Sequence, residues 1–188
     1  MRALFVTTNE DKRREAQRIL GVELVDAALD PQDVPEIQAL DFAEVAVHKA
    51  RAAREALGSP PYAVLVEDSG LVIGAWNGLP GALTKWFLAS VGNEGILTML
   101  SGEERAARAV CAVAVAGAGV RVFRGEVEGE ISPEPRGEGG FGWDPIFVPK
   151  GSHLTYAEMG ENKHQDSHRA RAFRQVRRWL EEQDRRED

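Results

Sequence analysis

The chain has 188 residues and a formal net charge of -7, and 43% of its residues are hydrophobic. No apolar run approaches the roughly 18 residues that a membrane span needs, and we find neither a signal peptide nor more than one cysteine. These features predict a cytoplasmic globular protein that binds neither a membrane nor, as its main partner, a nucleic-acid duplex, because duplex binding needs a dominant basic surface.

The first third of the chain predicts strands that alternate with helices. Residues 2–8 form an apolar run that ends in hydroxyl side chains, and residues 10–20 follow with helical spacing and acids in the first turn. Residues 22–27 predict a second strand. Residues 29–38 are acid-rich and broken by prolines, which predicts a loop, and residues 41–57 predict a second long helix.

The remaining elements include the longest strands. Residues 63–75 predict two short strands with a hinge at Ser69 and Gly70. Residues 78–100 begin as a turn and predict one or two helices. Residues 108–131 contain two apolar or alternating runs separated by glycines, which predicts a long hairpin. Residues 167–188 carry an apolar stripe among many arginines and predict a closing helix with a solvated basic face.

A glycine-rich stretch, GEGGFGWDPIF at residues 137–147, has the G-x-G-x-x-G spacing of loops that bind a dinucleotide pyrophosphate. Such a loop needs a helix that opens from its last glycine, but here a proline forces the chain toward extended geometry. We therefore reject a dinucleotide loop. Phe141 and Trp143 next to Asp144 instead predict a surface that stacks on a flat partner such as a purine, and an idle surface loop is the alternative.

Two adjacent acids, Glu67 and Asp68, end an apolar strand. Neighbours in an extended chain point to opposite faces, so a turn at Ser69 is needed to bring one acid to a metal and the other to a water molecule. Glu36 in the acid-rich loop is a plausible third oxygen donor. This set suits Mg²⁺, which takes one or two carboxylates plus substrate phosphates, whereas the alternative is an ordinary acidic turn.

Lysine is scarce, with five lysines among 23 basic residues, and an ammonium suits phosphate as a compact point charge. The turn between the first strand and helix carries groups that could hold a phosphate: Thr7, Thr8, Asn9 and Lys12. A second polar group surrounds the start of the last helix, with a serine suited to its N-cap: Lys163, Ser167, His168 and Arg169. Four of the five lysines lie in or beside segments that stand out on other grounds.

Six motifs, in order, resemble those of the inosine triphosphate pyrophosphatase, or Ham1-like, family: TTNEDK, PEIQ, VEDSGL, GLPGALTKWF, FGWDPIF and NKHQDSHR. The resemblance spans nearly the whole chain. It implies one domain over residues 1–188 with a mixed α/β fold, an elongated central sheet, flanking helices and two lobes around a cleft. It also implies a homodimer that uses Mg²⁺ to cleave purine nucleoside triphosphates, preferably ITP, dITP and XTP, into monophosphate and pyrophosphate.

The resemblance also implies roles for individual positions. Asp68 would be the catalytic base, with Glu36 and Glu67 as first-choice metal ligands and Asp68 as a shared one. The residues expected to bind substrate are Thr7, Thr8, Asn9, Lys12, Lys49, Ser69 and Lys85 around the phosphates, Phe141, Gly142, Trp143 and Asp144 around the base, and Lys163, His168 and Arg169 near its 6-keto edge. Many bacterial members have aspartate and tyrosine where this chain has Glu67 and Trp143, which leaves the division of metal ligands and base open.

Two other functions remain open from the sequence. The first is a nucleotide sensor that has kept the pocket and lost turnover. The second is a Maf-like pyrophosphatase with modified pyrimidine substrates on a related fold.

Overall fold

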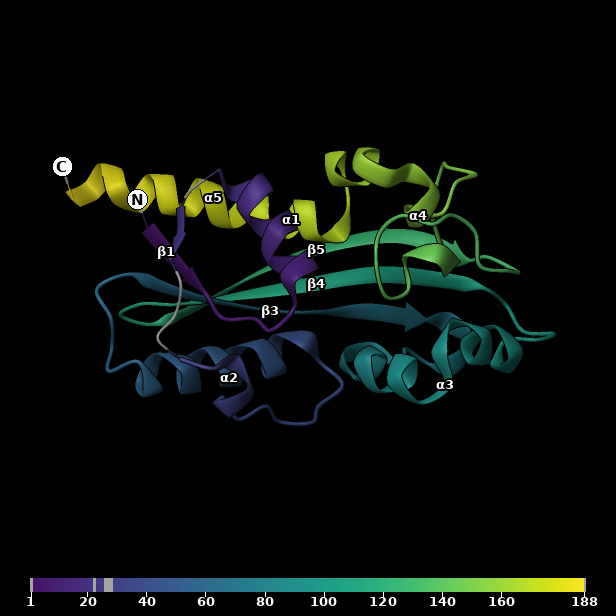
Figure 1. The fold of residues 1–188 in the computed structure, drawn as a ribbon, viewed down its shortest axis with the longest axis horizontal. Coiled ribbons are helices and arrows are strands. Elements are labelled where there is room, and N and C mark those ends of the chain that lie inside the picture. The colour runs from purple at the N-terminus through teal and green to yellow at the C-terminus, as the bar shows by residue number, and fades with distance from the viewer. Residues whose placement is uncertain (1, 22, 26–28, 188) are drawn as a thin grey trace.

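A single six-stranded sheet forms the centre of the computed structural model, which describes residues 2–21, 23–25 and 29–187 (Figure 1). The strands follow the order β2-β1-β3-β4-β5-β6. Their bounds are Arg2–Phe5 for β1, Glu23–Val25 for β2, Ala63–Ile73 for β3, Ala106–Ala116 for β4, Val120–Ile131 for β5 and Phe147–Pro149 for β6. β1 is parallel to β2 and β3, and the other pairs are antiparallel. The predicted mixed, elongated sheet is thus confirmed.

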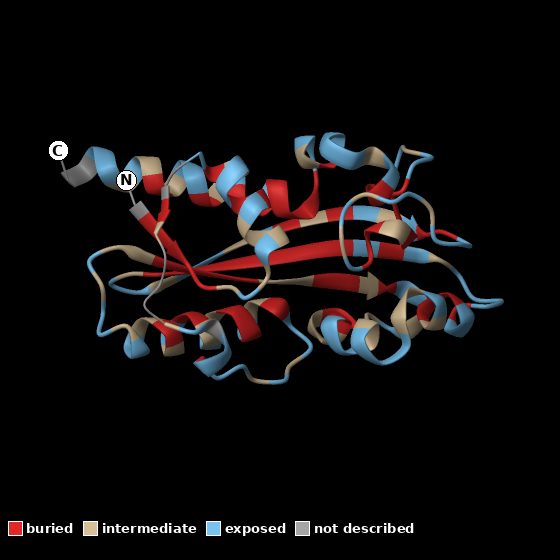
Figure 2. Ribbon diagram, in the orientation of Figure 1, coloured by how far each residue is buried: buried red, intermediate tan, exposed pale blue. Residues whose placement is uncertain are grey.

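Within the described residues, five α-helices flank this sheet. They are α1 (Glu10–Leu20), α2 (Phe42–Ala56), α3 (Thr84–Met99), α4 (Tyr156–Met159) and α5 (His168–Glu187). Figure 1 shows α1 and α5 above the strands and α2 and α3 below them, and Figure 2 shows that the strand segments between these layers are buried. No helix among the described residues is long and apolar enough to cross a membrane.

The helix ends follow the sequence signals. The side chain of Asn9 accepts a hydrogen bond from the Lys12 N–H at 3.0 Å, and the side chain of Ser167 accepts one from the Ala170 N–H at 3.1 Å. These caps satisfy N–H groups that a helix start leaves unpaired. The predicted hairpin is also confirmed as β4 and β5, which pair over eleven positions. The predicted second strand is shorter, and residues 22 and 26–27 of that prediction lie outside the described residues.

The predicted hinge at Ser69 and Gly70 is wrong, because β3 is one continuous strand. Its pairing with β4 runs without interruption through both residues. Gly70 serves a close contact instead of a turn: a Cβ atom added there would lie 2.2 Å from Oγ1 of Thr84. That hydroxyl bridges β3 and the start of α3 by accepting from the Leu71 N–H and donating to the Gly81 carbonyl.

The two faces of β3 carry different layers. Leu65 packs with α1 and α5 residues, whereas Val64 and Val66 pack with α2 residues. Because side chains alternate along a strand, Glu67 continues the α1/α5 face and Asp68 continues the α2 face. Cys111 lies fully buried on the α1/α5 face.

Gly125 marks the tightest contact between β5 and α5. A Cβ atom there would lie 2.1 Å from the carbonyl oxygen of His168 and 2.5 Å from the backbone nitrogen of Ala172. We expect Gly125→Ala to lower the free energy of unfolding by about 1–3 kcal/mol, because the helix backbone has to move away. Urea denaturation measures this, with Gly119→Ala as the control, since nothing lies within 4 Å of a Cβ there. Equal stability of the two variants would contradict the prediction.

Candidate active site

The candidate site lies where β3 continues beyond its parallel neighbour. β1 pairs with β3 over residues 63–65, and the Val6 N–H donates to the Leu65 carbonyl at 2.9 Å. Between residues 66 and 71, no described strand pairs with this edge of β3. Both faces of the strand are therefore accessible from the edge, at the carboxyl end of β1, where open α/β sheets commonly bind ligands.

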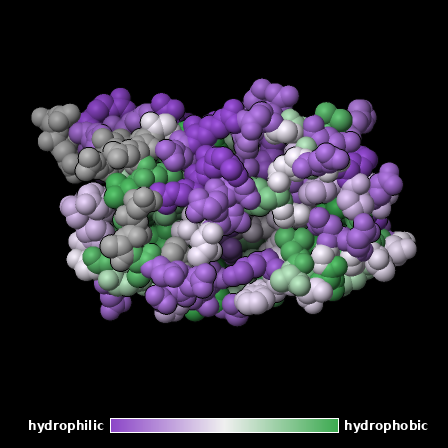
Figure 3. Space-filling model, in the orientation of Figure 1, coloured by the Kyte–Doolittle hydropathy of each residue, from purple (hydrophilic) through white to green (hydrophobic). Residues whose placement is uncertain are grey.

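A cavity of about 340 Å³ occupies this edge. It is lined by every predicted site residue except Lys163, and additionally by Val6, Thr84 and Leu88. The predicted residues come from segments that are far apart in the sequence, so the fold brings together what the motifs singled out separately. Figure 3 shows a hollow near the middle of the face in view, bordered largely by hydrophilic residues.

One end of the cavity is rich in hydroxyls and ammonium groups. The Asn9 N–H donates to Oγ1 of Thr7 at 3.1 Å, and the side chain of Asn9 caps α1, so the turn uses two of its own N–H groups internally. The ammonium of Lys12 lies 3.4 Å from Oε1 of Glu67. Lys49 and Lys85 line the same cavity from α2 and α3. Three ammonium groups around one cavity provide the charge that a polyphosphate needs.

The two adjacent acids are in different environments. Glu67 is fully buried, and both its carboxylate oxygens accept hydrogen bonds from Arg169, at 2.8 and 2.9 Å. Burial on its own raises the pKa of Glu67, but Arg169 and then Lys12 outweigh that effect and hold the pKa well below its usual range. Glu67 is therefore a permanently charged counter-ion for Arg169, and a metal ion at Glu67 would have to compete with that guanidinium.

Asp68, on the opposite face, has an unsatisfied carboxylate oxygen. Its Oδ2 is buried and has no hydrogen-bond partner among the described residues. Burial raises its pKa most strongly; Lys12 opposes that rise, Glu36 and Glu67 add to it, and the pKa reaches about 7. A carboxylate with a pKa near neutrality can both take up and release a proton at physiological pH, which is the property of a general base.

Glu36 faces Asp68 from the loop before α2. Its Oε2 lies 2.6 Å from the ammonium of Lys49. Burial raises the pKa of Glu36, but the hydrogen bond and charge of Lys49 lower it further, so the net shift is downward. Glu36 is therefore ionised beside Asp68 and raises the pKa of that neighbour.

The other end of the cavity is aromatic. Trp143 is only 8% exposed, so it is not the free surface ring that its sequence context suggests. It packs against Phe147 and Tyr156, and its ring centroid lies 5.0 Å from that of His168. The ring of Phe141 lies over the charged ends of Lys163 and Arg169, at 5.0 and 5.4 Å. Phe141 and Trp143, together with Gly142 and Leu88, line this end of the cavity.

His168 is a neutral polar group within this aromatic end. Burial, and to a smaller degree the charges of Arg169 and Lys163, keep its pKa well below the usual range. Both ring nitrogens are buried without a hydrogen-bond partner among the described residues. A neutral imidazole offers one donor and one acceptor, so His168 can read the polar edge of a ligand.

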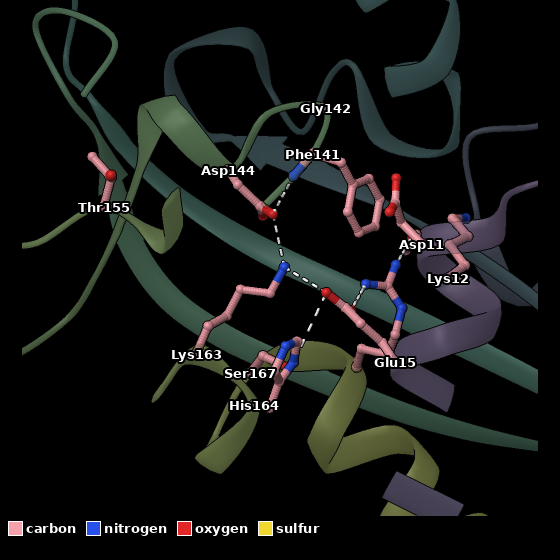
Figure 4. A network of polar contacts seen from close by, with 12 residues as sticks. Asp11, Lys12, Glu15, Phe141, Gly142, Asp144, Thr155, Lys163, His164 and Ser167 are labelled. Atoms are coloured by element: carbon pink, nitrogen blue, oxygen red, sulfur yellow. Dashed lines mark hydrogen bonds and ion pairs between the residues drawn. The ribbon is translucent and has the colours of Figure 1, made fainter. Parts of the chain in front are cut away.

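Lys163 is placed differently from its prediction. It is 2% exposed and does not line the cavity, and its ammonium lies 2.7 Å from Asp144 and 2.8 Å from Glu15 (Figure 4). Asp144 in turn accepts from the Phe141 N–H at 2.9 Å. Lys163 therefore supports the segment that carries Phe141 and Trp143, through its ion pair with Asp144.

Glu15 is the main polar residue that the sequence analysis missed. It is buried on α1 and binds both Lys163 and Arg169. Burial raises its pKa, but Arg169 and Lys163 more than offset this and keep Glu15 ionised. The signal was present, because Glu15 falls on the apolar stripe with Ala16 and Leu20, where a charged residue needs a buried partner.

The donor set fits a hard divalent cation completed by substrate. No three His, Cys, Asp or Glu side chains of the described chain converge into a ready-made metal site. Asp68 with its unpaired Oδ2 and the neighbouring Glu36 supply two carboxylates, and Mg²⁺ typically takes only one or two and fills its shell with phosphate oxygens and water.

A larger hollow, about 890 Å³, lies near the far end of the sheet over Arg108, Glu128 and Lys150. Its charged groups pair with neighbours: Arg108 with Glu126 at 2.7 Å and Lys150 with Glu128 at 2.8 Å. It contains none of the predicted site residues. The smaller cavity therefore has the better chemistry for a site.

Comparisons with known proteins find relatives over nearly the whole length of the chain. The sequence profile of the Ham1 family matches residues 3–179. A dITP/XTP pyrophosphatase of Methanopyrus kandleri is 44% identical over 183 residues, which cover 95% of this chain and 96% of that protein. An inosine triphosphate pyrophosphatase of Yarrowia lipolytica is 44% identical over 190 residues and 97% of each chain. The structure of a HAM1 protein from Coxiella burnetii superimposes with a TM-score of 0.82 at 30% identity, covering 97% and 99% of the two chains. The chain therefore belongs to the Ham1 family.

Proposed function

We propose that this protein hydrolyses non-standard purine nucleoside triphosphates, namely dITP, ITP and XTP, to the monophosphate and pyrophosphate, and so removes them from the nucleotide pool. One observation carries the proposal: Asp68, with its unpaired oxygen, lies in one cavity between three lysines and an aromatic end with a neutral histidine. The names of the Methanopyrus and Yarrowia relatives support the same substrates.

The cavity supplies the parts that cleavage at the α-phosphorus needs. Lys12, Lys49 and Lys85 hold the phosphates and offset their charge. Asp68 accepts a proton from a water molecule whose oxygen forms a bond to the α-phosphorus, while the bond between that phosphorus and the bridging oxygen breaks and pyrophosphate leaves. Enzymes catalyse phosphoryl-group chemistry mainly by positioning the reactants and by stabilising charge. The three lysines and Asp68 supply both effects.

We further propose that Asp68 and Glu36 hold Mg²⁺, with Glu67 kept as the counter-ion of Arg169. When bound, the ion would neutralise charge on the phosphate oxygens. The ion pair with Lys49 holds Glu36 in the cavity wall.

Base selection is proposed to rest on His168 and the two aromatic rings. Phe141 and Trp143 offer stacking surfaces, which accept any purine. A donor from His168 would pair with a 6-keto oxygen, whereas the 6-amino group of adenine would leave donors facing each other. This favours hypoxanthine and xanthine over adenine.

The test incubates the protein with dITP, ITP, XTP, ATP, GTP and modified pyrimidine triphosphates, with Mg²⁺ and separately with EDTA. Products are separated by anion-exchange chromatography, and a reaction in ¹⁸O-labelled water locates the attacked phosphorus. We expect monophosphate carrying the label and unlabelled pyrophosphate, from dITP, ITP and XTP above all, and no turnover in EDTA. Diphosphate and inorganic phosphate as products would contradict cleavage at the α-phosphorus.

The same panel separates the two alternatives. Tight ITP binding without product would establish the sensor, and preference for modified pyrimidines would establish the Maf-like enzyme. Membership of the Ham1 family and the aromatic purine end favour neither.

We also propose that the protein is a cytoplasmic homodimer, as the family resemblance implies. Sedimentation velocity at micromolar concentration should give twice the chain mass of 20.6 kDa. A single species of chain mass would contradict the dimer.

A further inference from the structure

Asn93 lies at a break in α3, opposite the loop that carries Phe141. Gly92 has φ 65° and ψ -173°, so it interrupts the helix, and the following residue departs from the line of the first half. From this position the side-chain nitrogen of Asn93 donates to the carbonyl oxygen of Gly142 at 2.9 Å. Among the described residues this is the hydrogen bond that ties α3 to residues 137–144, which we call the aromatic loop.

The aromatic loop is held from two directions. On one side Asp144 accepts from the Phe141 N–H and from Lys163, so that end is fixed to the α1/α5 layer. On the other side Trp143 packs in one apolar cluster with α3 residues, and Gly142 accepts the hydrogen bond from Asn93 of that helix, which also carries Lys85 at the phosphate end of the cavity. Gly142 has φ 63°, a conformation that glycine leaves readily, so the loop backbone at this point needs an external restraint.

The amide of Asn93 adds little to folding. Its Oδ1 is buried without a hydrogen-bond partner among the described residues, and an unsatisfied buried acceptor destabilises a fold. The favourable contribution of the side chain is thus its donor to Gly142. Gly142 lies between Phe141 and Trp143, which both line the cavity. The hydrogen bond from Asn93 to the Gly142 carbonyl can therefore control the geometry of the two rings.

We propose that Asn93 is a positioning residue for base selection, which fixes the aromatic loop to α3 and thereby holds Phe141 and Trp143 at the distance that a stacked 6-keto purine requires. Asn93 itself lies outside the cavity lining and touches no reacting group. This inference rests on the proposed function, and it adds that discrimination depends on the hydrogen bond that joins Asn93 of α3 to Gly142 of the aromatic loop.

The test compares Asn93→Ala and Asn93→Asp with the wild type and with Glu94→Ala, an exposed neighbour in the same helix. We measure kcat and KM for ITP and for ATP, which carries the 6-amino purine, and the inhibition constant of inorganic triphosphate as a probe of the phosphate end alone. We expect the ratio of kcat/KM for ITP to that for ATP to fall about fivefold in Asn93→Ala and further in Asn93→Asp, whose carboxylate repels the Gly142 carbonyl. The inhibition constant, the midpoint of thermal unfolding and the Glu94→Ala values should stay near the wild type.

An unchanged ratio in both Asn93 variants would overturn the inference. So would a parallel loss of ITP and ATP turnover together with weaker triphosphate inhibition, since that pattern means a general disturbance of the site. Neither result would contradict the proposed function. That proposal fails only if the wild type itself does not convert ITP to IMP and pyrophosphate.

Discussion

Asp68→Asn is expected to lower kcat for ITP hydrolysis by about 10²- to 10⁴-fold, the usual contribution of a positioned general base. Asparagine keeps the shape of the side chain, and since Oδ2 of Asp68 has no hydrogen-bond partner among the described residues, the fold loses no bond there. Steady-state kinetics should show the loss in kcat more than in KM. As a control, Glu130→Gln removes another strand carboxylate, exposed and outside the cavity, and should leave kcat unchanged.

The same variant should also be more stable than the wild type in metal-free buffer at pH 8. The pKa of Asp68 is raised to about 7 from 3.8, so the folded protein binds an extra proton between these values and loses stability as the pH rises through this window. The asparagine of the variant has no proton to lose, so the advantage of the variant should grow from about pH 4 to pH 7 and then level off. Thermal melts in EDTA across this range measure the difference. If the variant is fully active, or less stable at pH 8 than at pH 4 relative to the wild type, Asp68 has been assigned wrongly.

Arg169→Met is expected to cause the largest loss of stability. It leaves Glu67 and Glu15 buried without the guanidinium that both contact, and breaking a buried ion pair on one side costs about 3–5 kcal/mol. Urea denaturation at pH 7 measures the loss. Arg178→Met, on the exposed face of the same helix, is the matched control and should change the free energy of unfolding by less than about 0.5 kcal/mol.

The loss should shrink in acid. In the wild type the pKa values of Glu67 and Glu15 are lowered, so the stability they contribute is complete above their unfolded pKa near 4.5 and is lost as the pH falls through the folded values. In the variant both carboxyls protonate more readily, so its deficit should be smaller at pH 4 than at pH 7. A deficit that does not depend on pH would mean that packing, not charge, dominates at Arg169.

Much of the fold was predictable because its signals are local. Periodicity, caps and glycine turns located α1, α2, α5 and the β4–β5 hairpin within a few residues. The continuity of β3 could not be predicted, because a serine followed by a glycine is typical of a turn. Gly70 is required for another reason, since the Thr84 side chain packs against it. Such a contact joins residues that only the folded chain brings together.

The site shows the same division. The motifs identified the segments that surround the cavity, but they did not show which side chains of those segments line it. Lys163 carries the right charge in the right segment, yet the fold directs it to Asp144 and Glu15. Likewise, composition cannot distinguish the roles of Glu67 and Asp68, because the distinction is made by Arg169, which lies about a hundred positions further along the chain.

The unbroken pairing between β3 and β4 determines the faces of the sheet to which Glu67 and Asp68 point. Ten consecutive residue pairs fix the register of β3, and the last bond from β1 ends just before the acids. A slip of one residue would turn Glu67 toward Glu36 and Lys49 and press Asp68 against the guanidinium of Arg169, exchanging the reactive acid for the inert one. The register between β3 and β4 thus determines which carboxylate can act as a base.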